Sequence, residues 1–174
     1  MVKPTKTTKP KGGIIMRNVN KTLVLLTALV FVVGMTGLAA ADGPNDSFVY
    51  QDGKRNSVDQ DLWGQNNDAD VVQYGNANDS NQITTGNLNY SWVYQDGNRN
   101  WAKTRQTAQK NDAFITQEYG DDNSAYINQT ASYNSASIYQ NGDENSGTII
   151  QKSQDNTASL IQIGSNNTAD ITQY

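Results

Sequence analysis

The side chains with the most regular spacing in this 174-residue sequence are primary amides. Counted from Ser47 in steps of eleven residues, with one extra residue near Gly120, the chain divides into twelve units. The fifth position of the unit is Gln in ten of the twelve, and a later position is Asn without exception from Asn56 to Asn167. An amide both donates and accepts hydrogen bonds, so stacked identical amides can bond to one another, although they offer no acid–base or nucleophilic chemistry.

Groups for ordinary catalysis are scarce. The sequence has no His and no Cys, which removes the common general base, the thiol nucleophile and the soft metal ligands. Two pairs of adjacent acids, Asp121–Asp122 and Asp143–Glu144, lie where the repeat predicts turns, without a pocket to raise a pKa. Gly spacings such as Gly75 to Gly86 punctuate the repeat, and no predicted helix follows them, as a phosphate-binding loop requires. We therefore expect no enzyme, no cofactor and no metal site.

The elements that must position the amides follow from the other constrained positions of the unit. The first position holds Ala, Ser or Gly in eleven of the twelve units, and the third position holds Val, Ile or Leu in nine. The second position is mixed, with Phe48, Asp59 and Lys103 among its members. Constraint at alternate residues predicts a β-strand with one buried face, whereas a helix would need a spacing near 3.6.

A small residue followed by Asn closes each unit and predicts a turn, in which Gly or Asn takes left-handed backbone angles. The Gln-x-Gly pattern holds mainly in alternate units, while the units between drift to Ala108, Ala131 and Ser153, so the period is 22 residues. The six repeats are 45–66, 67–88, 89–110, 111–133, 134–155 and 156–174. We predict an all-β fold, a β-solenoid of six stacked 22-residue strand–turn–strand–turn repeats over residues 47–174, rising about 4.8 Å per coil.

In such a solenoid each amide lies against its equivalent one coil along. A buried amide is costly unless it is hydrogen-bonded, and an amide ladder meets that need. Aliphatic residues such as Val71 and Ile115 would give a narrow dry core beside it, and the second unit departs from the pattern because Gln60 and Leu62 are exchanged. The residues expected to carry the ladders and the assembly are Gln51, Asn56, Gln73, Asn78, Gln95, Asn100, Gln117, Asn123, Gln140, Asn145, Gln162, Asn167 and Gln173.

Composition alone would also fit a disordered chain, because apolar residues are sparse and there is no Cys for disulfides. Disorder has no reason to keep register over eleven units, so the repeat favours a folded structure. Residues 42–174 hold 7 Lys and Arg against 17 Asp and Glu, a net charge of −10. So acidic a chain is expected to bind no nucleic acid.

The first 41 residues have the features of a secretory signal peptide. They combine a basic start, an apolar stretch at 23–38 and the small residues Ala39 to Ala41. We expect cleavage after Ala41, with Ala39 as the second choice, and translation that starts at Met16. A signal anchor is the alternative, but the apolar stretch is short for a span and no basic stop-transfer cluster follows it. The mature chain is thus predicted to begin with a short segment, 42–46, and to have no membrane span.

The repeat resembles the curlin repeat of curli fibre subunits over residues 45–174. The curlin pattern Asn-x5-Gln-x-Gly-x2-Asn-x-Ala-x3-Gln is represented here by Asn89, Gln95, Gly97, Asn100, Ala102 and Gln106. The resemblance implies a secreted subunit that polymerises with copies of itself into an extracellular amyloid fibre, a fimbrium that serves biofilm matrix and cell adhesion. It also implies passage through the periplasm and an outer-membrane secretion pore, and nucleation by a second subunit.

Two details qualify the resemblance. The intact final half-repeat, 169–174, favours the major rather than the nucleator subunit. The segment 42–46 is shorter than the Gly/Asn-rich segment that the pore recognises in many curlins.

Both ends of the predicted solenoid are uncapped β-edges, the feature by which sheets associate. We expect the last coil, with Gln162, Asn167 and Gln173, to stack on the first coil, with Gln51 and Asn56, of the next copy, which makes an open fibre. The alternatives are a monomeric solenoid with frayed ends and a monomeric secreted solenoid that binds ice or glycan. Surface recognition of that kind needs a regular outward array, and here the inward positions are the regular ones.

One outward row has a repeated aromatic residue. Tyr50, Tyr94 and Tyr139 share the fourth position of alternate units, which places them on one wall, two coils apart. Such a row forms either an adhesive or dye-binding stripe or an ordinary set of contacts with cross-strand neighbours.

Overall fold

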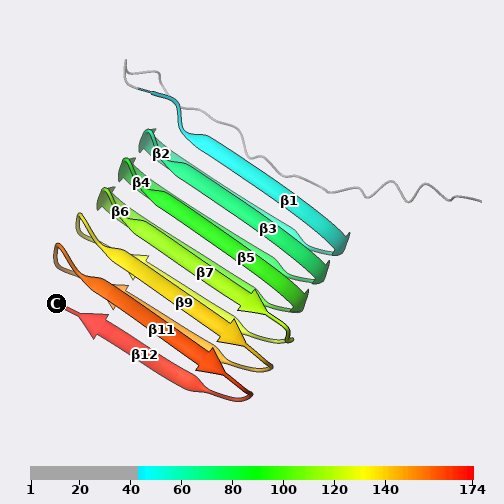
Figure 1. Ribbon diagram of the computed structural model, residues 1–174. Coiled ribbons are helices and arrows are strands. Elements are labelled where there is room, and N and C mark those ends of the chain that lie inside the picture. The colour runs from blue at the N-terminus through cyan, green and yellow to red at the C-terminus, as the bar shows by residue number, and fades with distance from the viewer. Residues whose placement is uncertain (1–42) are drawn as a thin grey trace, which may run out of the picture.

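The computed structural model describes residues 43–174, and the predicted signal peptide lies outside the described residues. These residues form a two-walled solenoid of twelve strands without a helix, which confirms the predicted all-β solenoid of six coils (Figure 1). The strands are β1 (Asp46–Lys54), β2 (Ser57–Gln65), β3 (Asp68–Asn76), β4 (Asp79–Asn87), β5 (Tyr90–Asn98), β6 (Trp101–Gln109), β7 (Asp112–Glu118), β8 (Ser124–Gln129), β9 (Ser135–Asn141), β10 (Ser146–Gln151), β11 (Thr157–Ile163) and β12 (Thr168–Gln173).

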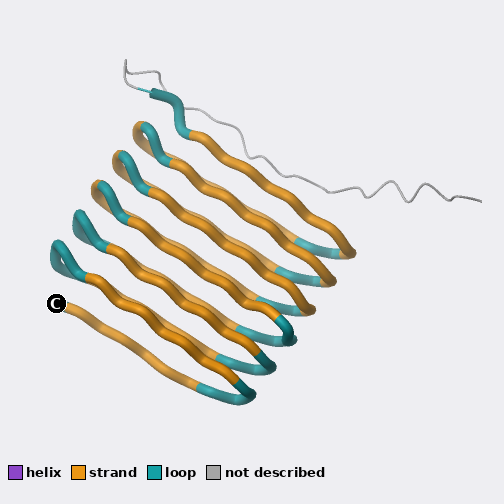
Figure 2. The backbone as a smooth tube through the Cα atoms, in the orientation of Figure 1, coloured by secondary structure: helices purple, strands orange, loops and turns teal. Residues whose placement is uncertain are grey.

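The strands divide into two parallel sheets, because each coil contributes one strand to each wall. Sheet A has the order β1-β3-β5-β7-β9-β11, and sheet B has the order β12-β10-β8-β6-β4-β2. The turns gather along the two edges between the walls (Figure 2). We number the coils from coil 1 (β1 and β2) to coil 6 (β11 and β12), and we call the coil 1 end upper and the coil 6 end lower.

Register follows the 22-residue period, as predicted. Val49 pairs with Val71 and Val71 with Val93, so each row down a sheet collects equivalent positions of the repeat. The extra residue expected near Gly120 is Tyr119, since neighbouring coils are offset by 22 residues above and below this turn and by 23 across it, as at Trp101↔Ser124. The side chain of Tyr119 is 75% exposed and its backbone is left-handed, so the turn absorbs the insertion without disturbing either sheet.

The core is a thin layer between the two sheets. Ile115 and Ile138 of sheet A meet Ile127 and Ile149 of sheet B there, and all four are buried. Burial of each such side chain contributes about 1.5–3 kcal/mol. The Ala and Ser residues of the first position are buried beside them, and their small size lets the walls approach closely enough for amides to reach from one sheet to the other.

The turns differ from the sequence prediction in one respect. In the first six strands the extended backbone runs through the Gly position, and a Cβ on Gly53 would lie 1.7 Å from the carbonyl oxygen of Gly75 in the next coil. Most of the repeat Gly residues take a positive φ, as predicted, but the Asn that closes the unit does not. The residue before that Asn is left-handed instead, and it is often unsuited to that conformation, as at Ala77 and Leu88. Each such residue costs about 1–2 kcal/mol, so something else must hold the turn closed.

Within residues 43–174 no helix is long and apolar enough to cross a membrane.

Candidate functional site

The Gln residues of sheet A form one unbroken ladder. Each Nε2 donates to the Oε1 of the Gln one coil below, at 2.6–2.9 Å, along Gln51, Gln73, Gln95, Gln117, Gln140 and Gln162. The same Nε2 donates its second hydrogen across the core, as from Gln73 to the carbonyl oxygen of Ser57 at 3.0 Å. Every interior amide of this row therefore uses both donors, which removes the cost of burying it and ties the two sheets together.

The Asn residues act on the turns rather than as a simple amide ladder. The backbone N–H of Asn78 donates to Oδ1 of Asn56 at 3.0 Å, and Nδ2 of Asn56 donates to the carbonyl oxygen of Gly75 at 3.1 Å. The pattern recurs down both edges of the solenoid, and at Asn123 and Asn145 the two side chains also bond directly. This clamp satisfies the buried backbone of each turn and offsets the strain of the left-handed residue before it.

The Gln row of sheet B changes position partway down the stack. In the lower coils it stands at the fifth position, with the chain of bonds Gln106, Gln129, Gln151 and Gln173 at 2.9–3.1 Å. In β2 and β4 it stands at the third position, where Gln60 Nε2 donates to Gln82 Oε1 at 2.6 Å. The exchange noticed at Gln60 and Leu62 thus extends through a second strand, which Gln82 and Thr84 already indicate in the sequence.

Hydroxyl groups bridge the step between the two Gln rows. At this step Gln82 has Thr104, not Gln, below it, and its Nε2 donates to Ser91 Oγ of the opposite sheet at 2.9 Å. Ser91 Oγ lies 2.7 Å from Thr104 Oγ1, and Thr84 Oγ1 donates to Gln106 Oε1 at 3.4 Å. Three short hydroxyl side chains therefore replace the amide-to-amide bonds that the exchange removes.

The two ends of the stack carry complementary groups in sheet A and along one turn edge. Within residues 43–174, Oε1 of Gln51 accepts no hydrogen bond at the upper end, and Nε2 of Gln162, which has no amide below it, donates to the carbonyl oxygens of Ser146 and Asn167 at 2.9 and 3.0 Å. The Asn clamps run the opposite way: Oδ1 of Asn167 receives no backbone N–H from a following coil, and the backbone N–H of Asn56 has no Asn above it. Each end thus offers what the other lacks.

The comparison with known families bears on the lower half of this stack. The model of the curlin associated repeat matches residues 119–142, 134–164 and 142–174. Residues 119–174 of this chain are therefore similar to curlin associated repeats. The matched curlin repeats lie in coils 4 to 6, where both Gln rows are regular, and the exchanged rows of β2 and β4 lie outside them. No curated protein matches the chain.

The positions chosen from the sequence lie in sheet A, along one turn edge and, for Gln173, in sheet B. All six sheet A Gln residues fall in one row, and the six Asn residues from Asn56 to Asn167 fall in one turn edge. Gln173 ends the separate Gln row of sheet B. The residues that sequence reasoning missed are Ser91, Thr84 and Thr104. The hydroxyl groups of Ser91 and Thr104 bond across the core, and Thr84 bonds to Gln106 one coil below in its own sheet.

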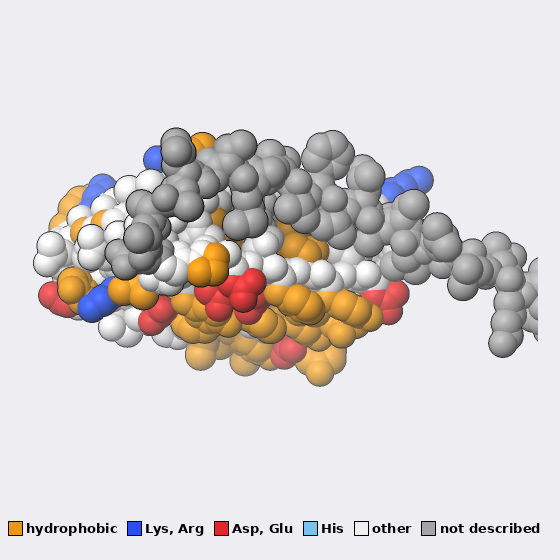
Figure 3. Space-filling view, turned by 90° about the horizontal axis from the view of Figure 1, so that it is seen from above, with side chains coloured by type: hydrophobic (Ala, Val, Ile, Leu, Met, Phe, Trp, Pro, Cys, Tyr) orange, Lys and Arg blue, Asp and Glu red, His pale blue; other side chains and the backbone are white. Residues whose placement is uncertain are grey.

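The outward face of sheet A is apolar and acidic. Figure 3 shows apolar side chains gathered along that side of the molecule, and the exposed members include Phe48, Tyr50 and Tyr74. Tyr74 fills the gap between Tyr50 and Tyr94, with ring centroids 5.6 and 6.0 Å apart, so these Tyr residues pack against cross-strand neighbours. Tilted aromatic contacts of this kind are worth about 0.5–1.5 kcal/mol each.

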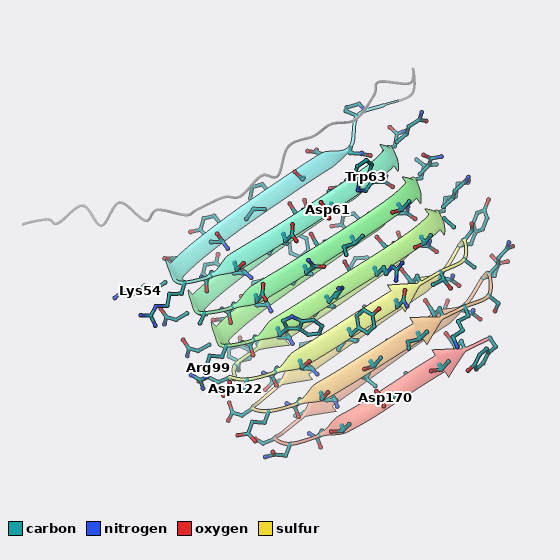
Figure 4. The ribbon with its side chains drawn as sticks, turned by 180° about the vertical axis from the view of Figure 1, so that it is seen from behind. Lys54, Asp61, Trp63, Arg99, Asp122 and Asp170 are labelled. Atoms are coloured by element: carbon teal, nitrogen blue, oxygen red, sulfur yellow. The ribbon has the colours of Figure 1, made fainter. Side chains whose placement is uncertain are left out.

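Carboxylates lie beside the aromatic rows. Burial raises the pKa of Asp68 and the pKa of Asp70, and the neighbouring charge of Asp46 raises both further. At the turn edge, Arg99 donates to Asp122 at 2.6–2.7 Å, and this hydrogen bond lowers the pKa of Asp122 (Figure 4). No group of three or more His, Cys, Asp or Glu among residues 43–174 could hold a metal ion.

Proposed function

We propose that this chain is the structural subunit of an extracellular amyloid fibre of the curli type, in which copies stack end to end through their Gln and Asn rows. The observation that carries the proposal is the complementarity of the two open ends. No helix covers either end among the described residues. Residues 43–45 contact Asn66 and Leu62 at the upper end of sheet B, and strands β1 and β11 of sheet A each leave one edge unpaired. Open edges of this kind template further strands.

The rows of sheet A continue across such a contact. One coil below β11, the β1 strand of the next copy would place Gln51 under Gln162 and Val49 under Leu160. The direction of the bonds also fits, since Nε2 of Gln162 would exchange its bond to the carbonyl oxygen of Asn167 for one to the free Oε1 of Gln51, the arrangement that the interior Gln residues have. Because the upper end of one copy meets the lower end of another, the contact is heterologous and does not close, so it produces a fibre.

The similarity to curlin associated repeats supports the biological setting. We propose that the chain is secreted through the periplasm and an outer-membrane pore, that a second subunit nucleates it, and that the fibre serves biofilm matrix and adhesion at the cell surface. The complete pairing of β12 with β10, from Ser146↔Thr168 to Gln151↔Gln173, favours the major subunit, since it leaves a well-formed lower end for growth.

The outward rows do not favour the monomeric alternative, a solenoid that binds ice or glycan. Ice and glycan arrays need equivalent outward groups at each coil. The row that begins with Phe48 continues instead with Asp70, Trp92, Phe114 and Ser137. Regularity lies inside the solenoid, where a partner could reach it only through the ends.

The test is assembly of purified residues 42–174, which contain all twelve strands, after fresh dilution from denaturant. We expect a lag and then growth in thioflavin-T fluorescence, loss of the lag on seeding, and fibres in electron micrographs. Gln162→Lys should abolish growth, because it places a charge in the end contact, whereas Ser159→Lys adds the same charge on the outward face and should leave growth largely intact. A chain that stays monomeric with a β-type circular dichroism spectrum would contradict the proposal.

A further inference from the structure

The two ends of the solenoid match in sheet A but differ in sheet B. The lowest strand of sheet B, β12, has Ile171 at the third position and Gln173 at the fifth. The uppermost strand, β2, has Gln60 at the third position and Leu62 at the fifth. If β2 of one copy lies one coil below β12 of another, an aliphatic side chain meets an amide at both positions.

We infer that the axial contact between copies is continuous in sheet A and mismatched in sheet B, so that every junction between subunits contains a built-in weak half. The inference rests on the proposed end-to-end assembly and specifies its chemistry. The partner is a second copy of this chain, since the sheet A rows and the Asn clamps fit that partner.

The mismatch leaves amide groups without partners. Nε2 of Gln173 donates one hydrogen across the core to the carbonyl oxygen of Thr157 at 3.0 Å, and its second hydrogen would face Leu62 of the next copy. Oε1 of Gln60 would lie under Ile171 of the previous copy, which has nothing to donate. Once the junction excludes water, each unpaired group opposes the contact.

The Gln row of sheet B also changes position inside the molecule, and there other side chains satisfy the unpaired amides. Between β4 and β6, the hydroxyl groups of Ser91, Thr84 and Thr104 take up the amide bonds. At the junction, Ser47 stands at the position equivalent to Ser91, but Leu62 and Ile171 have no hydroxyl. The interior step is therefore bridged and the junction is not, and fibres are expected to grow and break at the junction.

Two exchanges that keep the composition unchanged test this inference. The upper exchange is Gln60→Leu with Leu62→Gln, and the lower exchange is Ile171→Gln with Gln173→Ile. Either one alone places amide against amide and aliphatic against aliphatic at the junction. The two together restore the mismatch in the opposite sense.

The measurement is the critical concentration, the soluble protein that remains at the end of seeded growth of residues 42–174, for the original chain and the three variants. Each exchange also creates one mismatch inside its own copy, and these interior costs should combine independently because the two sites lie at opposite ends. The effect on the junction does not combine independently, because each exchange alone removes the mismatch and the two together restore it. We expect the critical concentration of the combined variant to exceed, by at least about tenfold, the value obtained by multiplying the two single effects.

If the two effects simply multiply, the inferred mismatch is wrong. If the original chain forms no fibre at all, the proposed function is wrong instead. The growth curve of the original chain therefore distinguishes the two failures. Circular dichroism of each variant before assembly measures its overall β content, and a loss of coupling at unchanged β content is attributed to the junction.

Discussion

Sheet A and sheet B are built from the same repeat, yet they satisfy their buried amides differently. Sheet A has Gln at the fifth position of every strand, so each of its six Gln residues bonds to another Gln. Sheet B moves its Gln row by two residues between β4 and β6 and needs hydroxyl groups from both walls to bridge the step. The difference teaches that a stack of coils depends on continuity of chemistry along each row more than on the composition of any one coil.

The Gly position shows the same contrast. In sheet A every coil has Gly there, from Gly53 to Gly164. In sheet B the row begins with Gly64 and Gly86 and continues with Ala108 at a φ of 96°, after which β8 and β10 end at Gln129 and Gln151. β7, β9 and β11 also end before their Gly, so among residues 43–174 Ala108 is the only residue other than Gly that takes a positive φ at this position, a conformation that Gly adopts more readily.

The largest expected change in stability comes from a substitution at the Gly position of sheet A. Gly75→Ala should destabilise the fold by about 3 kcal/mol or more, because the new Cβ would lie 1.9 Å from the carbonyl oxygen of Gly97. The matched change in sheet B, Ala108→Gly, should stabilise it by about 1 kcal/mol, because Gly adopts a positive φ without cost. Urea unfolding of freshly diluted protein, followed by circular dichroism, measures both. Equal destabilisation by the two changes would contradict the comparison.

The next largest change in stability distinguishes two Ser residues, Ser91 and Ser80, that are equally buried. Ser91→Ala should cost about 1–3 kcal/mol, because Gln82 loses the hydroxyl that receives its amide. Ser80→Ala should be neutral or slightly stabilising, since Ser80 Oγ is buried without a hydrogen-bond partner among residues 43–174. The urea midpoints of the two variants give the answer. A Ser80→Ala variant as damaged as Ser91→Ala would mean that the bridging role is mistaken.

A smaller effect sharpens the contrast between the outward faces. The pKa values of Asp68 and Asp70 are raised, chiefly by burial; the charge of Asp46 raises both, and the charge of Asp68 raises the pKa of Asp70. These groups therefore bind protons more tightly in the folded state than in the unfolded state. Stability should therefore rise as the pH falls through the raised pKa values and be fully gained below the ordinary value of 3.8. Asp68→Asn with Asp70→Asn should flatten this part of the pH profile of unfolding, and Asp59→Asn with Asp61→Asn in sheet B is the control of equal charge. An unchanged profile in the sheet A variant would oppose this explanation.

The smallest effect concerns the exposed pair at the turn edge. Arg99 lowers the pKa of Asp122, so the contribution of this pair is present near neutral pH and lost as the pH falls through the lowered value, the opposite sign to Asp68. Arg99→Gln should give only a slight decrease in the urea midpoint, and the decrease should disappear in high salt because exposed charges are screened. A decrease that persists in high salt would indicate a packing role for the Arg99 side chain.

The rows of equivalent residues could be predicted from the sequence because they depend only on the spacing of residues along the chain. Asn or Gln recurring every eleven residues fixes which residues share a face and which coil each belongs to. The same recurrence placed the insertion near Gly120, one residue from its actual position at Tyr119. The bonding within the rows could not be obtained in the same way. The direction of the Gln bonds and the Asn clamp on the turn depend on backbone geometry that the columns do not contain.

The bridging hydroxyl groups are the clearest example of this limit. Ser91 occupies a position where Ala or Ser fits equally well by size, and only its distance to Gln82 and Thr104 across the core reveals its role. The left-handed backbone of Ala77 and Leu88 was likewise hidden, because the neighbouring Asn, and not the residue itself, makes that conformation tolerable.

The most direct test of end-to-end stacking is a structure of the assembled fibre by cryo-electron microscopy. The expected result is a continuous solenoid in which β12 of one copy pairs in parallel with β2 of the next, with a subunit repeat of six coils, about 29 Å. A fibre in which each copy occupies a single layer, with an axial repeat of about 4.8 Å, would contradict the account, because the coils would then not exist in the assembly.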